Sequence, residues 1–297
     1  MKYYKGLCVF LAVLLLFGTV SFAGEGPQAE EEGNPAFTSE ELILKNGEED
    51  IYGVMYLPSN EQEKYPTVIL SHGFGSSYSA MQGIAEGLAG NGFAAYVYDF
   101  IGGGPDSKSG AADGDMTHMS VLTEASDLSA VMDQIMALDY VDEAQLFLLG
   151  ESQGGYVSAY VAAQRPEDVC ALVLKYPAFA LQDDCWKRHK SIDAIPETEK
   201  IMGHTIGAIY SQDAMSFDIY DVIGGYKKDV LICHGINDNL VQPSYSERAV
   251  EVYENAELHM YEKAGHVFAG DNAVKFINEV TEFLNAHLNA DEMDKAA

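Results

Sequence analysis

The residues best suited to chemistry lie in the segment Gly150-Glu151-Ser152-Gln153-Gly154. The apolar run 146–149 leads directly into this segment, and the stretch 153–164 leaves it with a helical pattern. A serine between a buried strand and a helix is held at a tight turn with its hydroxyl exposed. Glycines on both sides allow the strand and the helix to approach closely. We therefore predict that Ser152 is a nucleophile.

A serine hydroxyl attacks well only when a base removes its proton, which calls for a histidine. The chain has eight histidines, and His266 follows Ala264 and Gly265 just beyond an apolar strand at 257–261. Loops after the strands of a parallel sheet meet at its carboxyl edge, where ligand crevices form. His266 is therefore the predicted general base.

The base in turn needs a carboxylate that fixes its tautomer and stabilises its cation. Asp238 lies in the loop after the apolar strand 230–233, in a position that matches this role. Glu262 and Asp99 are weaker alternatives. The order of the predicted triad along the chain is Ser152, Asp238, His266.

Acyl transfer also requires N–H groups that bind the oxyanion of the tetrahedral intermediate. The segment 70–75, Leu-Ser-His-Gly-Phe-Gly, follows the strand 67–71 and is a loop that can donate one such group. The residue after the nucleophile donates the other. We assign the oxyanion hole to the backbone N–H groups of Phe74 and Gln153, and expect His72 to hold the loop in shape.

Strand and helix patterns alternate over most of the chain. Strands are expected at 42–45, 51–57, 67–71, 93–98, 146–149, 171–174, 230–233 and 257–261, and helices at 78–89, 121–138, 153–164, after Pro243 and at 272–288. Ser120 is the expected N-cap of the second helix. Such alternation predicts a mostly parallel sheet between helix layers. The Asn46-Gly47 turn predicts a hairpin that adds antiparallel strands at one edge of the sheet.

One long segment interrupts this alternation and predicts a cap over the site at about residues 178–221. It contains Trp186, a basic run at 187–190 and Tyr210. Trp186 and Tyr210, together with Phe74, are candidates for the substrate pocket, although each could equally pack the cap against the core.

The N-terminus has the pattern of an export signal. Lys2 and Lys5 precede the uncharged apolar run 7–20, and Ser21-Phe22-Ala23 places small residues at a cleavage site. We predict a signal peptide at 1–23, an acidic Glu- and Gly-rich linker at 24–36, and one domain at 37–297. The expected location is extracellular, with an uncleaved N-terminal anchor as the alternative.

The formal net charge of −29 favours a neutral or cationic partner over nucleic acid or anionic membranes. It is equally explained as a means of staying soluble. Cys170, Cys185 and Cys233 would remain after cleavage, and an odd count favours buried free thiols, with a Cys170–Cys185 bridge as the alternative. No metal-spaced Cys/His cluster is visible in the sequence, so no metal is expected.

Taken together, these motifs resemble the α/β-hydrolase superfamily, and within it most closely the bacterial cinnamoyl or feruloyl esterases. The resemblance is carried by residues 72–75 (HGFG), 150–155 (GESQGG), 234–241 (HGINDNLV) and 264–266 (AGH). It implies a mostly parallel eight-stranded sheet flanked by helices, with a small cap. It also implies cofactor-free hydrolysis of small or hydroxycinnamoyl esters, including plant-polysaccharide-linked ones. The segment 100–105, Phe-Ile-Gly-Gly-Gly-Pro, departs from the Gly-His-Gly of many relatives.

Two other functions remain open at this point. A serine peptidase of the prolyl-oligopeptidase kind shares the serine motif, but usually carries a large N-terminal propeller. A non-catalytic binding protein on the same scaffold would have no reason to keep Asp238 and His266. The oligomeric state is not indicated by the sequence.

Overall fold

The computed structural model describes residues 36–110 and 115–288. The predicted signal peptide and nearly all of the predicted linker at 24–36 lie outside the described residues. Within the described part of the chain, three cysteines, Cys170, Cys185 and Cys233, are all free thiols. No helix in that part is both long and apolar enough to cross a bilayer.

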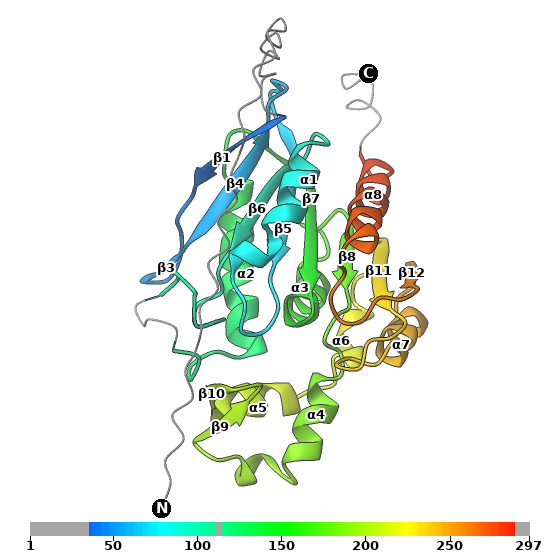
Figure 1. The fold of residues 1–297 in the computed structure, drawn as a ribbon. Helices are drawn as coiled ribbons and strands as arrows, with labels where there is room; N and C mark the ends of the chain where they lie inside the picture. Colours follow the sequence, from blue (N-terminus) through cyan, green and yellow to red (C-terminus); the bar gives the residue numbers. More distant parts are fainter. Residues whose placement is uncertain (1–35, 111–114, 289–297) are drawn as a thin grey trace, which may run out of the picture. The chain divides into compact units, whose positions relative to one another are not determined.

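The centre of the fold is an eight-stranded sheet (Figure 1). Across the sheet the strands are β1 (Phe37–Glu41), β4 (Gly53–Pro58), β6 (Ala94–Tyr98), β5 (Tyr65–Ser71), β7 (Val141–Glu151), β8 (Leu172–Lys175), β11 (Val230–Gly235) and β12 (Ala256–Tyr261). The pairs β1–β4 and β4–β6 are antiparallel, and all the others are parallel. The expectation of a mostly parallel eight-stranded sheet is therefore confirmed.

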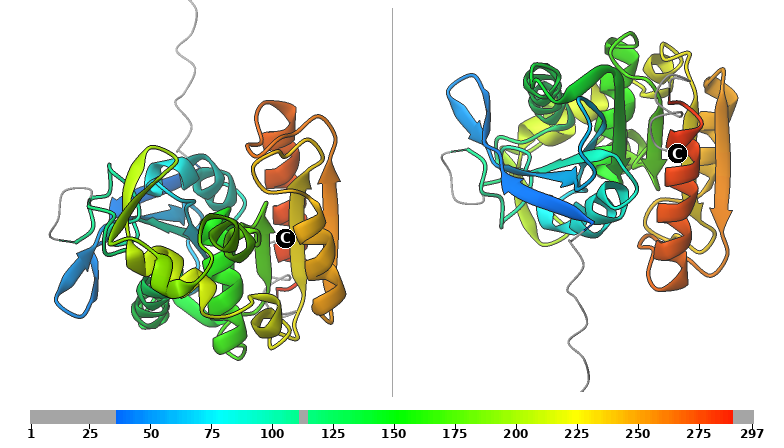
Figure 2. Two further views of the ribbon diagram at one scale, coloured as in Figure 1. Left: turned by 90° about the horizontal axis from the view of Figure 1, so that it is seen from below. Right: turned by 90° about the horizontal axis from the view of Figure 1, so that it is seen from above.

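Helices cover both faces of the sheet, and alternate strand residues feed two separate cores. Ile69 and Leu148 join the core beneath α2 (Val121–Met136) and α3 (Gln153–Gln164), with α6 (Tyr220–Ile223) and α7 (Ser244–Val252) also contributing. Leu70 and Leu149 join the core beneath α1 (Gln82–Ala89) and α8 (Asp271–Asn285). Figure 2 shows α8 lying along β11 and β12. This is the three-layer arrangement that the alternating pattern predicted.

The site-bearing crevice follows from the strand order. The chain runs from β5 outward to β6 and then returns to the other side of β5 as β7, so that Ser71 pairs with Gly150. Ligands of open parallel sheets bind where the strand order reverses in this way, at the carboxyl ends of the strands. The loop after β5 and the turn after β7 therefore meet at that edge.

The Asn46-Gly47 turn forms a hairpin, but not at the edge of the main sheet. Gly47 has a φ of 60°, and the turn joins β2 (Leu44–Asn46) to β3 (Glu49–Ile51) as a separate two-stranded sheet. The antiparallel edge of the main sheet is built by β1 and β4 instead. The expected placement was wrong because the hydrophobic pattern gives pairing within the hairpin but not its partner in the rest of the fold.

The interruption after β8 forms a small cap. It contains α4 (Leu181–Arg188), the 3-10 turn η2 (Ile192–Ala194), the hairpin β9 (Thr198–Ile201) and β10 (His204–Gly207), and α5 (Ala208–Met215). In Figure 1 these elements gather at one end of the sheet. A contact with the main domain lies at Gly207, where a Cβ would come within 1.9 Å of the carbonyl oxygen of Thr117.

The N-cap of α2 also ties the domain to the cap. The Ser120 Oγ accepts the N–H groups of Leu122 and Thr123, and the Thr123 Oγ1 accepts the N–H of Ser120. The Ser120 hydroxyl donates to the Asp213 carboxylate of α5 at 2.5 Å. One serine therefore caps a helix and fixes the position of another.

We expect Ser120→Ala to lower the free energy of unfolding by about 1–2 kcal/mol, because α2 loses its capping oxygen. Urea denaturation measures the change. Ser129→Ala is the matched control, since its hydroxyl only donates to the Ala125 carbonyl within the same helix. Equal losses in the two variants would contradict a special role for the cap residue.

Candidate active site

The turn after β7 holds Ser152 in a strained conformation. Its φ is 51° and its ψ is −117°, in a region that non-glycine residues seldom occupy. Its N–H donates to the Lys175 carbonyl, and its own carbonyl accepts the N–H groups of Tyr156 and Ala178. These bonds hold the serine at the corner between β7 and α3, as the sequence predicted.

Glycine is required beside the serine because backbones nearly touch there. A Cβ on Gly150 would lie 2.2 Å from the Gly154 carbonyl oxygen, and a Cβ on Gly154 would lie 2.3 Å from the Ser71 carbonyl oxygen. Both contacts are far below van der Waals distance and both involve backbone, which cannot move aside easily. The strand β5, the strand β7 and the helix α3 can therefore meet at this point only when both positions are glycine.

The structure brings Ser152, His266 and Asp238 into one hydrogen-bonded chain. The Ser152 Oγ lies 2.9 Å from the His266 Nε2, and the His266 Nδ1 lies 2.7 Å from the Asp238 Oδ2. A carboxylate only accepts hydrogen bonds, so the Nδ1 carries the proton and the Nε2 is free to accept the serine hydroxyl. This is the geometry that a serine nucleophile and its base require. Of the two weaker alternatives, Glu262 is exposed, and Asp99 accepts hydrogen bonds from two loop N–H groups.

Asp99 is fully buried and organises loops instead. Its carboxylate accepts the N–H groups of Tyr78 at 2.6 Å and Lys108 at 2.7 Å. His72 likewise serves the loop, since its Nδ1 lies 2.8 Å from the Gly73 carbonyl and its Nε2 accepts the Phe100 N–H. Burial lowers the pKa of His72, which keeps the ring neutral.

Asp238 is held by four hydrogen bonds. The N–H groups of Leu240 and Val241 both donate to its Oδ1 at 2.9 Å, and His266 and His234 lie against its Oδ2. Burial raises the pKa of this carboxyl, but the bonds from the two histidines and from Val241 outweigh burial and hold the pKa well below its usual range. The carboxylate therefore stays ionised below the pH at which a free aspartate takes up its proton.

His234, whose role the sequence did not reveal, is completely buried behind Asp238. Its Nε2 faces two acceptors, the Asp238 carboxylate at 3.1 Å and the Val241 carbonyl at 3.0 Å. The Nε2 therefore carries the proton, and the Nδ1 accepts the Ser246 hydroxyl at 2.7 Å. The sequence contains one indication of this contact, because His234 and Asp238 lie only four residues apart at the end of β11 and in the loop after it.

A second missed residue, Tyr176, supports the ring of His266. The two ring centroids are 4.6 Å apart, and Tyr176 has a φ of 41°. The Tyr176 hydroxyl donates to the Glu151 Oε2 at 2.9 Å, and the buried Lys175 ammonium lies 3.0 Å from the same oxygen. A satisfied ion pair thus anchors the aromatic surface on which the histidine rests.

The predicted oxyanion donors lie beside the serine. Phe74 and Gln153 line the same pocket as Ser152, and a Cβ on Gly73 would be 3.2 Å from the Ser152 Cβ. Gln153 is the first residue of α3, so its N–H has no acceptor within the helix. No described residue accepts the N–H of Phe74. Both N–H groups are therefore available to a developing negative charge.

The side chain of Gln153 links the domain to the cap. Its Nε2 donates to the Glu124 Oε2 at 2.8 Å, and its Oε1 accepts the Tyr210 hydroxyl at 2.8 Å. Burial raises the pKa of Glu124 well above its ordinary value. Phe74 packs between two cap residues, with its ring centroid 5.5 Å from that of Tyr210 and 5.8 Å from that of His204. Cap residues thus contact both predicted oxyanion residues.

The pocket at Ser152 has a volume of about 170 Å³ and mostly apolar walls. Its lining comes from the oxyanion residues, the cap and the loop of Asp238: Phe74, Ser152, Gln153, Ala178, Ala180, Leu181, Asp184, Arg188, Ile201, Met202, Tyr210, Leu240 and Val241. Tyr210 lines this pocket, as predicted. Trp186 does not line it and is 45% exposed, so this part of the prediction was wrong. On α4 the residues 181, 184, 185 and 188 face inward, and position 186 falls on the opposite side.

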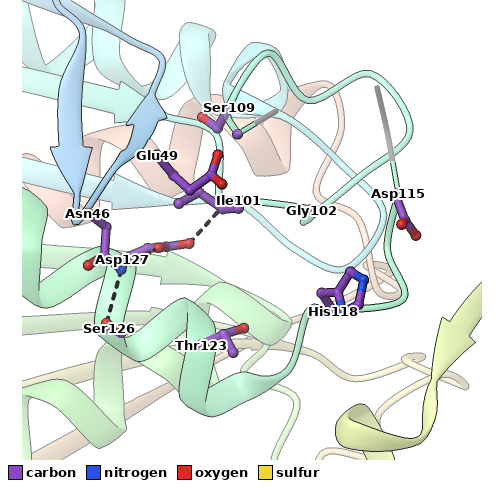
Figure 3. A pocket seen from close by; sticks show the side chains of 11 residues that line it. Asn46, Glu49, Ile101, Gly102, Ser109, Asp115, His118, Thr123, Ser126 and Asp127 are labelled. Carbon is purple, nitrogen blue, oxygen red and sulfur yellow. Dashed lines mark hydrogen bonds between the residues drawn. The ribbon is translucent and has the colours of Figure 1, made fainter. Parts of the chain in front are cut away.

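A cavity of about 430 Å³ lies apart from the triad (Figure 3). It is bounded by the hairpin β2–β3, the loop after β6 and α2, and Ser152, His266 and Asp238 do not line it. Asp127 accepts the Ile101 N–H and the Asn46 amide there. Burial raises the pKa of Asp127 to about 6. Its hydrogen bonds fasten the hairpin to the domain, which is a structural role.

Asp238→Asn should make the free energy of unfolding depend less steeply on pH in the acid range. In the wild-type protein the unfolded state takes up the Asp238 proton near pH 4, while the folded state stays ionised to lower pH. The contribution of Asp238 is therefore present above about pH 5 and is lost as the pH falls through its depressed folded-state pKa. Urea denaturation between about pH 5 and pH 2 should show a steeper loss for the wild-type protein than for the variant. Equal slopes would contradict the depressed pKa.

Tyr210→Phe should lower both stability and turnover. The variant leaves the buried Oε1 of Gln153 without its donor, which costs about 1–3 kcal/mol of unfolding free energy. Tyr226→Phe is a matched control, because this hydroxyl is also buried but donates to the Val169 carbonyl outside the pocket. Denaturation and kcat should both be measured. Unchanged kcat in Tyr210→Phe would show that the cap bond does not affect the oxyanion residue.

Comparison with known proteins identifies the family of the chain. Residues 62–216, which include Ser152 and both oxyanion residues but not Asp238 or His266, match the family described as "Serine aminopeptidase, S33". The pig (Sus scrofa) acylamino-acid-releasing enzyme is 28% identical over 135 residues, which are 43% of this chain and 18% of that protein. The uncharacterized protein YcjY of Escherichia coli is 30% identical over 151 residues, or 49% of this chain and 48% of that protein. The chain thus spans less than half the length of either relative.

Solved structures share the fold. The structure described as ferulic acid bound to Est1E from Butyrivibrio proteoclasticus superposes with a TM-score of 0.75 at 24% identity, covering 83% of this chain and 98% of that one. At this identity the likeness concerns the fold, and it confirms the predicted α/β-hydrolase architecture. The family match covers more than half of the chain. This protein therefore belongs to the serine aminopeptidase S33 family of α/β hydrolases.

Proposed function

We propose that this chain is a serine carboxylic ester hydrolase that works through an acyl-enzyme. The observation that carries the proposal is the continuous hydrogen-bonded chain from Ser152 through His266 to Asp238. Two unpaired backbone N–H groups lie beside the serine in a pocket with apolar walls. These are the parts that acyl transfer requires: a nucleophile, an oriented base and donors for an oxyanion.

The mechanism follows from the direction of each hydrogen bond. The His266 Nε2 removes the Ser152 proton as the Oγ attacks the ester carbonyl, and Asp238 stabilises the imidazolium that forms. The N–H groups of Phe74 and Gln153 bind the oxyanion of the tetrahedral intermediate. The imidazolium then protonates the leaving alcohol, which gives the acyl-enzyme. Water, activated by the same histidine, releases the acid and restores the serine.

The pocket supports an ester with a small or planar apolar acyl group. Its volume of about 170 Å³ and the walls formed by Phe74 and Tyr210 suit an acyl chain or one aromatic ring. Asp184 and Arg188 add polar groups that can hydrogen-bond a hydroxyl on such a ring. A hydroxycinnamoyl ester, free or linked to plant polysaccharide, meets both requirements. The Est1E structure described with bound ferulic acid supports this choice by fold likeness.

A second candidate is peptide hydrolysis. It is favoured by the description of the family and by the similarity to the acylamino-acid-releasing enzyme. The Asp184 carboxylate in the pocket could pair with the amino terminus of a peptide. A non-catalytic binding role is not favoured by any feature of the site. We further propose that the protein is exported, on the strength of the signal-like pattern at residues 1–23.

The test compares the protein with Ser152→Ala on p-nitrophenyl acetate, methyl ferulate and a Gly-Pro anilide. We expect turnover of the esters, and a loss of about 10⁴-fold or more in kcat in the variant, because the oxyanion donors alone cannot replace the nucleophile. Ser244→Ala, which removes an exposed hydroxyl, is the control and should keep full activity. The ratio of ferulate to acetate turnover measures the preference for an aromatic acyl group.

Each outcome decides between the candidates. Turnover of the anilide without either ester would replace the proposal with a peptidase. Equal turnover by the wild-type protein and Ser152→Ala would remove Ser152 as the nucleophile. No turnover of any of the three substrates by a folded wild-type protein would overturn the proposed substrate class.

A further inference from the structure

Three metal-ligating side chains meet beneath α8, far along the chain from one another. Cys233 of β11 and His259 of β12 are register partners in adjacent parallel strands, so their side chains share one face of the sheet. Glu279 of α8 lies over that face. The thiol, one ring nitrogen and one carboxylate oxygen all lie within 4.8 Å of one another. Figure 2 shows the helix running along these two strands.

The polar neighbours of the cluster orient each group as they do in metal sites. The His259 Nδ1 faces the Glu279 Oε2 at 3.2 Å, and its Nε2 faces the Glu257 carboxylate at 3.4 Å. A metal-ligating histidine commonly gives its other N–H to a carboxylate, which fixes the ring and its tautomer. Tyr261 donates its hydroxyl to the Glu279 Oε2, and Lys275 lies 3.3 Å from the Oε1. The carboxylate is therefore fixed as well.

The cluster is buried at its base and open at its rim. Cys233 is completely buried, while the side chains of His259 and Glu279 are 35% and 23% exposed. His259 and Glu279 line a cavity of about 590 Å³ with other acidic and imidazole groups, namely Asp229, Glu254, Glu257, Glu282 and His287. No lysine or arginine of the described residues lines that cavity. Its carboxylates outnumber Lys227 and Lys275, which pair with Glu254 and Glu279, so the cavity attracts a cation toward His259 and Glu279.

We propose that Cys233, His259 and Glu279 bind a zinc ion. A thiolate, an imidazole and a carboxylate together suit zinc, whereas calcium and magnesium prefer oxygen ligands alone. On binding, the Cys233 thiol releases its proton to solvent and its sulfur coordinates the metal. The Nδ1 of neutral His259 and one oxygen of Glu279 are the second and third ligands, and a water molecule completes the tetrahedral set. Ligands of a tetrahedral zinc lie about 3.3–3.8 Å apart, given bond lengths of about 2.0–2.3 Å. The side chains of His259 and Glu279 are partly exposed, so they can rotate to bring the ligand atoms to these distances.

The site is distinct from the proposed catalytic centre, and its ligands connect three elements of the fold. Ser152, Asp238 and His266 do not line the cavity at His259. The three ligands come from the last two strands of the sheet and from the last helix. One ion would therefore fasten the edge strand β12 and the helix α8 to β11. We expect zinc to raise the melting temperature of the protein and to leave its ester turnover unchanged.

Cobalt(II) is the probe for the first test, because it takes zinc sites and reports a thiolate ligand by a sulfur-to-cobalt charge-transfer band. The full protein should develop this band together with the visible absorption of tetrahedral cobalt, and zinc should displace both. Cys233→Ala should abolish the charge-transfer band. Cys185→Ala is the matched control, since this thiol is also buried but lies in the cap next to Arg188 and Ser211. It should keep the band.

Two further variants keep the test decisive if Cys233→Ala does not fold. Glu279→Gln should weaken cobalt binding at least about 10-fold, and Glu257→Gln, which loses the carboxylate behind His259, should weaken it about 10–100-fold. His287→Gln, in the same cavity but paired with Asp229, should bind normally. Cobalt binding without a charge-transfer band, or equal loss in His287→Gln and Glu279→Gln, would overturn the proposal. So would a zinc-dependent melting temperature that Glu279→Gln does not alter.

Discussion

The close approach of three backbones at Ser152 is the constraint on which the rest of the structure depends. Strand β7, helix α3 and the end of β5 meet so tightly that Gly150 and Gly154 leave no room for a Cβ. This contact forces the serine into its unusual conformation, and it brings the loop after β5 beside the first N–H of α3. The predicted nucleophile and both predicted oxyanion donors are thus positioned by the same close packing. The sheet and its two cores stabilise the strained corner, which could not persist alone.

Around that corner, Asp238 is bonded to two histidines, and Gln153 is bonded to both the main domain and the cap. His234 and His266 both lie against the same oxygen of Asp238, so the carboxylate that orients the base is itself oriented by a buried ring. Gln153 is bonded to Glu124 of the domain and to Tyr210 of the cap. The hydrogen bonds of the site therefore extend well past the reacting atoms, into the loop after β11 and into α5. Precision at a reacting centre generally requires such a supporting layer.

The sequence was informative wherever local pattern and function coincide. The turn at Ser152 and the loops that carry Asp238 and His266 could be predicted from the sequence, because the carboxyl ends of parallel strands lie at one edge of the sheet. Contacts between segments far apart in the chain could not be predicted. The hairpin at Gly47 forms its own two-stranded sheet, and Trp186 is exposed and does not line the pocket. The cluster of Cys233, His259 and Glu279 was missed for the same reason. Its members lie on three elements, and only the strand register and the packing of α8 bring them together.

The bond between Tyr210 and Gln153 has a consequence for how this protein could diverge. Cap segments and other loops generally tolerate more variation than the elements that carry them. Here the same tyrosine forms a wall of the pocket and supports the residue beside the nucleophile. Under the proposed ester hydrolysis, a substitution of Tyr210 that widens the pocket also removes the hydrogen bond that supports Gln153. Selectivity and turnover are therefore coupled in the proposed enzyme, and substitutions at the exposed pocket residues Met202 and Leu240 would change the pocket without breaking that bond.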